Sequence, residues 1–247
     1  MAAPPVESRA STRTAAACVV FTVVSLGHLG AQLAGLEPLA RVTQWLLMPF
    51  LALVLTAATS GAPRGRLVRL TLLSLGFSWL GDTAPDVAPE GAAFIVMIAF
   101  FLVAQVVFVA AFWPCRDASV LSPTQPARRR WLAAPYLLAL VALVVACAPG
   151  AGGLLVPVMV YGATLALMAA LATGVNRLVA LGGAIFVVSD SLIALNAFVD
   201  GWSLPGQGFW VMVTYIAAQT LIVAGVMGLA RAAGVDGGPD GRARVVV

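Results

Sequence analysis

The chain has 247 residues, of which 61% are hydrophobic and only 10% are charged, and its mean hydropathy is +1.00. A soluble domain carries roughly 25% charged residues, so this composition excludes an ordinary water-soluble protein and predicts a polytopic membrane protein. The formal net charge of +4 comes from 14 arginines, with no lysine in the chain. Because these arginines fall between apolar runs, they indicate membrane topology and argue against nucleic-acid binding.

Eight apolar runs predict eight transmembrane helices in a single domain over residues 15–230. Seven of the runs are close to the length that crosses the hydrocarbon core, and the third, 67–81, is short. The runs are 15–34, 39–58, 67–81, 92–113, 131–148, 154–173, 178–199 and 209–230. The first run is longer than the apolar part of a signal peptide, so we expect it to be retained. The polar segments 1–14 and 231–247 are expected to be disordered tails.

The arginines orient these helices. With the N-terminus in the cytoplasm, 13 of the 14 arginines lie on the cytoplasmic side and only Arg41 lies outside. Cytoplasmic loops of membrane proteins carry such an excess of basic residues. We therefore expect an all-α integral membrane protein with both termini cytoplasmic, located in the bacterial plasma membrane.

Asp190 lies inside the apolar run 181–198, where a carboxylate costs several kcal/mol unless it is paired or solvated. At 1.5 Å per residue, Asp82, Asp190 and His28 lie about 20–24 Å above the cytoplasmic ends of their helices. The other polar residues lie about 6–12 Å below the outer boundary; they are Gln44, Tyr161 and Tyr215. Polar residues on six helices thus share the outer half of the membrane, which predicts one site.

Spacing within the helices assigns polar faces. Ser74, Ser78 and Asp82 recur every four residues and form one polar stripe. Tyr215 and Gln219 form a second pair at the same spacing. Small residues share the helix face of Asp190 and would let another helix approach closely, which turns Asp190 toward the bundle interior; they are Gly183, Ala194 and Ala197.

Several of these residues have simpler explanations. His28 could be a hydrogen-bonded packing residue, and Ser74 could bond to its own helix backbone. Gln105 and Tyr161 could be interhelical hydrogen-bonding residues. A single histidine and three scattered cysteines (Cys18, Cys115 and Cys147) predict free thiols and neither a metal site nor a cofactor.

Two segments resemble the paired signatures of the YhhN family of membrane proteins, whose animal members are lysoplasmalogenases. The first segment, GFSWLGD, covers 76–82, and the second, GAIFVVSDSLIALNAF, covers 183–198. YIAAQTLIVAG, with Tyr215 and Gln219, is similar to the closing Y-x-x-A-Q motif of the family. The chain departs from the family at Gln44, where a lysine is common, and at Gln105 and Phe108, where a His-x-x-Tyr pair is common.

The resemblance implies hydrolysis of the vinyl ether of a lysoplasmalogen to a fatty aldehyde and a glycerophospho-alcohol. Such a reaction needs a proton donor for the vinyl carbon and a base or cation-stabilising carboxylate, as two carboxylates provide in glycosidases. Asp190 is our candidate donor and Asp82 our candidate base, and the reverse assignment stays open. The residues expected to orient substrate or water are Ser78, Ser189, Tyr215, Gln219, Gln44, Tyr161 and His28.

Arg41 could meet the substrate phosphate or serve as an interfacial anchor. The expected partners are a lysophospholipid and membrane lipids. The alternative function is a lipid-binding protein or a small proton-coupled transporter that uses the same aspartate pair. A purely structural scaffold is a third reading, and it predicts that both aspartates tolerate alanine.

Overall fold

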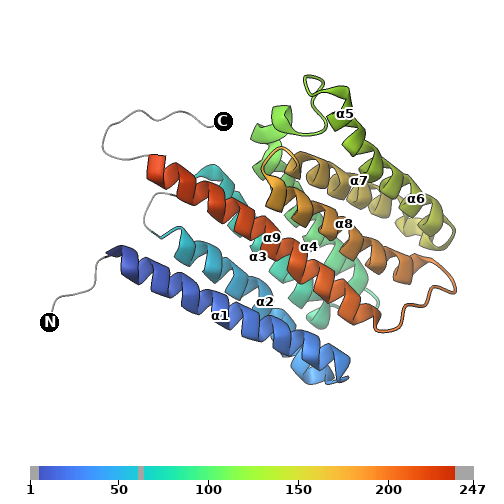
Figure 1. Ribbon diagram of the computed structural model, residues 1–247. Helices are drawn as coiled ribbons and strands as arrows, with labels where there is room; N and C mark the ends of the chain where they lie inside the picture. Colours follow the sequence, from blue (N-terminus) through green and yellow to red (C-terminus); the bar gives the residue numbers. More distant parts are fainter. Residues whose placement is uncertain (1–5, 61–63, 237–247) are drawn as a thin grey trace.

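The chain is a bundle of long helices, as the composition predicts. The computed structural model describes residues 6–60 and 64–236, which contain helices and no strand. Within these residues, eight helices have 18 residues or more (Figure 1); they are α1 (Val6–Leu33), α2 (Glu37–Ala58), α3 (Arg66–Thr83), α4 (Ala93–Phe112), α6 (Ala134–Ala151), α7 (Leu155–Ala172), α8 (Arg177–Phe198) and α9 (Gln207–Asp236). The expected all-α class is confirmed.

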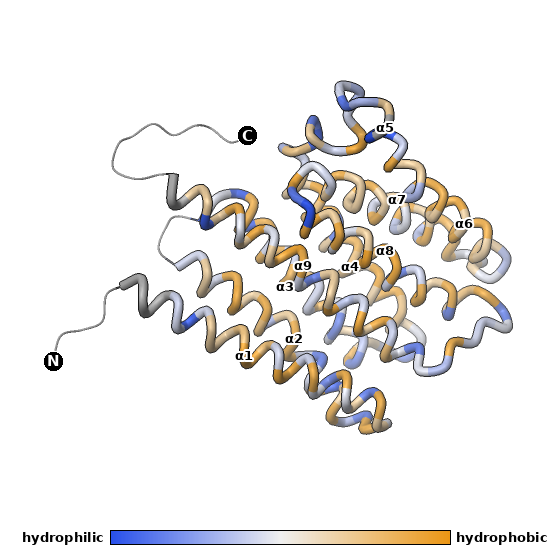
Figure 2. Tube along the Cα trace, in the orientation of Figure 1, coloured by the Kyte–Doolittle hydropathy of each residue, from blue (hydrophilic) through white to orange (hydrophobic). Residues whose placement is uncertain are grey.

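Six stretches of the described residues are long and apolar enough to cross a membrane. One of them, Trp131–Ala172, is 42 residues long and contains both α6 and α7, which fold back on each other at a short 3-10 turn, Gly152–Leu154. α3 is not among the six, because Arg66, Arg69 and Asp82 lie within its 18 residues. Figure 2 shows that the long helices are mainly apolar along their length. The protein is an integral membrane protein.

Two helices extend beyond the apolar runs. α1 begins at Val6, so residues 6–14 are helical, although their polarity suggested a disordered tail. α9 continues to Asp236, six residues beyond the predicted end. Extending an existing helix by one residue adds a backbone hydrogen bond without a new nucleation cost, and polarity does not prevent it. The remainder of both predicted tails, 1–5 and 237–247, lies outside the described residues.

Glycines place α8 between α7 and α9. A Cβ atom on Gly182 would lie 2.7 Å from the Ala218 carbonyl oxygen of α9. A Cβ atom on the next residue, Gly183, would lie 3.1 Å from Ala169 Cα of α7. Only glycine permits backbones to approach this closely on both sides of one helix turn. The helix that carries Asp190 is therefore held in the interior of the bundle.

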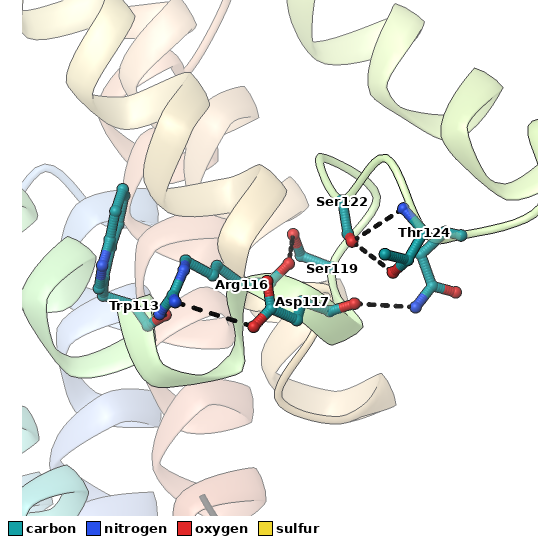
Figure 3. Close-up of polar contacts among 7 residues, drawn as sticks. Trp113, Arg116, Asp117, Ser119, Ser122 and Thr124 are labelled. Carbon is teal, nitrogen blue, oxygen red and sulfur yellow. Dashed lines mark hydrogen bonds and ion pairs between the residues drawn. The ribbon is translucent and has the colours of Figure 1, made fainter.

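The segment between α4 and α6 packs at the end of the bundle where α4 ends and α8 begins. It contains three short helices, η2 (Trp113–Ala118), α5 (Ala127–Arg130) and η3 (Trp131–Ala133). Figure 3 shows its own polar contacts, in which Ser119 Oγ donates to the Arg116 carbonyl at 2.6 Å. The Val120 N–H donates to Thr173 Oγ1 at 3.0 Å, which ties this segment to the end of α7. The segment therefore contacts the bundle at the end of α7, and Asp82 lies at the other end of the bundle.

Candidate functional site

Asp82 and Asp190 line one cavity of about 650 Å³. Asp82 is one residue from the end of α3, and Asp190 is eight residues, about 12 Å, from the end of α8. Both carboxylates are buried, with 8% and 7% exposure. The cavity lies where α1, α3 and α8 end and α2, α4 and α9 begin. Two carboxylates from distant parts of the chain therefore share one space.

Tyr215 fixes the position of Asp82. The Tyr215 hydroxyl donates to Asp82 Oδ2 at 2.9 Å across the interface between α9 and α3. Its ring packs edge-on against Phe101 and Phe186, with 5.7 Å between ring centroids in each case, which fixes the direction of the hydroxyl. Behind it, Gln219 Nε2 donates to Ser78 Oγ at 3.1 Å, and both side chains lie beside the Tyr215 hydroxyl.

Tyr161 fixes Asp190 in the same way. The Tyr161 hydroxyl donates to Asp190 Oδ2 at 2.5 Å, from α7 to α8. Gln105 of α4 is fully buried beside this hydroxyl, without a hydrogen bond of standard geometry. The neighbour of Asp190, Ser189, donates to the Val211 carbonyl at 3.1 Å and anchors α8 to α9. Each aspartate thus has its own tyrosine and its own helix pair.

The polar lining of the cavity contains carboxylates, amides and hydroxyls. No arginine or histidine is among the described residues that line it. Its polar members are Gln32, Gln44, Asp82, Ser189, Asp190, Asn196, Gln207 and Tyr215. Gln44 and Asp190 both interact electrostatically with the Asp82 carboxylate. Two interacting carboxyl groups favour a state in which one is neutral and the other is ionised.

The structure brings most of the predicted site residues together. Gln44, Ser189 and Tyr215 line the cavity with the two aspartates, and Ser78, Gln219 and Tyr161 support them from behind. Tyr161, whose role sequence reasoning left open, contacts Asp190 directly. Gln105 lies behind it.

Two predicted residues, His28 and Arg41, are not among the residues that line the cavity. His28 is fully buried and bonds α1 to α2, with Nδ1 3.0 Å from both the Ala40 carbonyl oxygen and Thr43 Oγ1. The Arg41 side chain is 61% exposed and pairs with Asp86 at 3.7 Å. Asp86 in turn accepts from Trp45 Nε1 at 2.8 Å, next to the cavity-lining Pro85. Arg41 therefore lies at the cavity mouth rather than inside.

Sequence reasoning missed three amide residues of the cavity: Gln32, Asn196 and Gln207. Gln32 follows His28 by four residues and so lies on the same helix face, and this spacing could have identified it. Gln207 donates to the Leu192 carbonyl at 2.7 Å and accepts from Trp202 Nε1 at 2.8 Å. It lies in the first turn of α9, where a count of apolar residues carries no signal.

The arrangement suits acid–base chemistry on a lipid. One neutral carboxyl group can donate a proton while an ionised one takes a proton from water, provided that both reach the same substrate. Apolar side chains complete the cavity wall; they are Phe94, Met97, Phe101, Ile193, Ala197, Val211 and Met212. Such a wall suits a molecule that is partly hydrocarbon.

Comparison with known proteins finds two relatives and one family that this chain matches. The chain is 30% identical over 224 residues to proteins named lysoplasmalogenase from Mycobacterium bovis and Mycobacterium tuberculosis. In both cases the match covers 84% of this chain and 78% of the relative. No solved structure matches. Residues 39–226 match the YhhN family, and this span includes both aspartates and both tyrosines of the site. The chain belongs to the YhhN family.

Proposed function

We propose that the protein is a membrane hydrolase that cleaves the vinyl ether of a lysoplasmalogen or a related lysolipid. The products are a fatty aldehyde and a glycerophospho-alcohol. One observation carries the proposal: Asp82 and Asp190 line one lipid-sized cavity, and each is held by a tyrosine hydroxyl. Membership of the YhhN family and the name of the mycobacterial relatives support it.

The reaction needs a proton donor and a base. A vinyl ether accepts a proton on the carbon remote from oxygen, and an oxocarbenium ion forms. Water then adds to the carbon next to oxygen and loses a proton to the base. The hemiacetal collapses to the aldehyde, and the glycerol oxygen leaves with a proton. Two carboxyl groups of opposite protonation state supply every proton transfer without a cofactor.

We infer that all eight long helices cross the membrane and that both termini face the cytoplasm. The helix bounds place Arg66, Arg177 and Arg231 at one end of the bundle and Arg41 at the other. This distribution follows the positive-inside rule if the first end is cytoplasmic. The cavity then opens at the outer face of the membrane. Since the relatives are bacterial, we place the protein in the bacterial plasma membrane.

Single substitutions test the two carboxylates. We expect Asp82→Asn and Asp190→Asn to lower aldehyde release by at least a hundredfold, because each removes a proton-transfer group but keeps the size of the side chain. Asp200→Asn is the matched control, since Asp200 is exposed at the end of α8. The variants should keep the thermal stability of the wild-type protein to within a few degrees. Full activity in either site variant removes that carboxylate from the reaction.

A lipid carrier that uses the aspartates as a proton relay is the alternative function. It would bind the lysolipid and release no aldehyde, so the same assay separates the two.

A further inference from the structure

A second, smaller pocket opens beside Asp190. It has a volume of about 50 Å³ and lies among α4, α6, α7 and α8. Asp190 and Tyr161 are the polar residues of its lining. The wall is otherwise apolar, with Val158 and Leu165 of α7 and Ala194 of α8 among its residues. Asp190 and Tyr161 bond each other, and the other described residues of the lining offer no side-chain polar group to a sugar, a phosphate or an ammonium group.

The pocket and the cavity are neighbours and share part of their walls. Five residues line both spaces; they are Phe94, Met97, Phe101, Asp190 and Ile193. Asp190 thus lies at the junction, whereas Asp82 lines only the polar cavity. A molecule that fills both spaces would pass Asp190 where its polar part meets its apolar part.

We propose that this pocket receives the first methylenes of the hydrocarbon chain of the lysolipid, and that this orientation makes Asp190 the proton donor. The inference rests on the proposed function. A cavity needs about 10–15 Å³ to hold one water molecule, and a methylene group is of similar size. The pocket of about 50 Å³ therefore holds about three to five methylenes. The rest of the chain would continue toward lipid past Ile98 and Leu143, which are half-buried.

The orientation assigns the two carboxyl groups. In a vinyl ether, the carbon that accepts the proton is the one attached to the hydrocarbon chain, and the carbon attacked by water is the one attached to oxygen. With the chain in the pocket, the first carbon faces Asp190 and the second lies nearer to Asp82. The π electrons take the Asp190 proton and leave a carboxylate. Asp82 accepts the proton of the attacking water and returns it to the departing glycerol oxygen. As the hemiacetal collapses, its hydroxyl proton passes to the Asp190 carboxylate, which restores both carboxyl groups to their starting states.

Binding measurements test the pocket without catalysis. We would titrate the full-length protein with saturated ether lysolipids that carry either a hexyl or a methyl group. Each methylene in an apolar site changes affinity about fourfold. We expect Val158→Phe and Ala194→Leu, which fill the pocket and exclude at least three methylenes, to weaken hexyl-ether binding about sixtyfold and methyl-ether binding less than twofold.

A matched control uses the other space. Ala197→Leu makes the same change as Ala194→Leu one helical turn later, where the side chain lines only the polar cavity. We expect it to weaken binding of both lysolipids equally. Equal losses for Val158→Phe or Ala194→Leu, or no loss, would overturn the pocket assignment and leave this space to a bilayer lipid. Normal hydrolysis in those variants with unchanged chain preference would do the same while sparing the proposed function.

Chemical rescue tests the assignment of Asp190. Added formate, a small base that can enter the cavity, should restore part of the aldehyde release in Asp82→Asn, because that variant keeps the proton donor for the vinyl carbon. It should not restore aldehyde release in Asp190→Asn. Rescue of the Asp190→Asn variant, or of neither variant, would overturn Asp190 as the donor.

Discussion

The hydrogen bond from Tyr161 to Asp190 gives a sharp prediction. Tyr161→Phe keeps the aromatic ring in place and removes only the hydroxyl that lies 2.5 Å from Asp190 Oδ2. A hydrogen bond to a charged group contributes about 1.5–3 kcal/mol. Asp190 becomes a charged carboxylate as it gives its proton to the substrate. The Tyr161 hydroxyl stabilises this charged form more than the neutral form, so its loss should raise the barrier to proton transfer. We expect kcat for aldehyde release to fall about 10- to 150-fold.

The chain supplies its own control for this experiment. It has three tyrosines, and the third, Tyr136, lies on α6 and lines neither space of the site. Tyr136→Phe should leave kcat unchanged. Both variants should be assayed for aldehyde release from a vinyl-ether lysolipid, and their thermal unfolding should be compared. Wild-type kcat in a folded Tyr161→Phe variant would refute the idea that this hydroxyl stabilises the Asp190 carboxylate in the reaction.

Three further predictions concern packing, substrate contact and chemistry. Gly182→Ala would place a Cβ 2.7 Å from the Ala218 carbonyl oxygen, so it should lower the free energy of unfolding by about 1–3 kcal/mol, as measured by thermal unfolding. The control variant Gly76→Ala, which has open space around the new Cβ, should not lower it. Equal stabilities of the two variants would contradict the close packing of α8 on α9. Arg41→Gln should raise KM severalfold at unchanged kcat, because the described part of the cavity lining has no cation for the phosphate and Arg41 lies at the cavity mouth. An unchanged KM would leave Arg41 as an interfacial anchor. In heavy water, the aldehyde, trapped by reduction as it forms, should carry one deuterium on the carbon next to its carbonyl, and an aldehyde without deuterium would rule out protonation of the vinyl carbon.

Much of the helical architecture could be predicted because it depends on length and hydropathy. The expected run 178–199 and the observed α8 (Arg177–Phe198) differ by one residue at each end. The depth of a side chain in the membrane could also be predicted, because its height along a helix follows from the residue count alone. Asp190, Tyr161 and Tyr215 therefore lie near one level, as counting predicts.

What could not be predicted is which side chains face one another. Counting cannot give the rotation of one helix against its neighbour. It grouped Tyr215 and Gln219 with both aspartates, whereas Tyr215 contacts Asp82 and Tyr161 contacts Asp190. It placed His28 at the right height, but His28 bonds to α2, and Gln32 one turn later lines the cavity. Rotational position depends on packing between distant segments, and single-helix patterns do not contain it.

The most direct test of the proposed function compares two substrates. The purified wild-type protein and the Asp82→Asn/Asp190→Asn double variant would each receive a vinyl-ether lysolipid and its saturated alkyl-ether analogue. We predict aldehyde release only from the wild-type protein with the vinyl ether, because only that substrate can form an oxocarbenium ion on protonation. Binding of both lipids by the wild-type protein without aldehyde release would contradict the proposed hydrolase, and release of aldehyde by the double variant would contradict the role of the two aspartates.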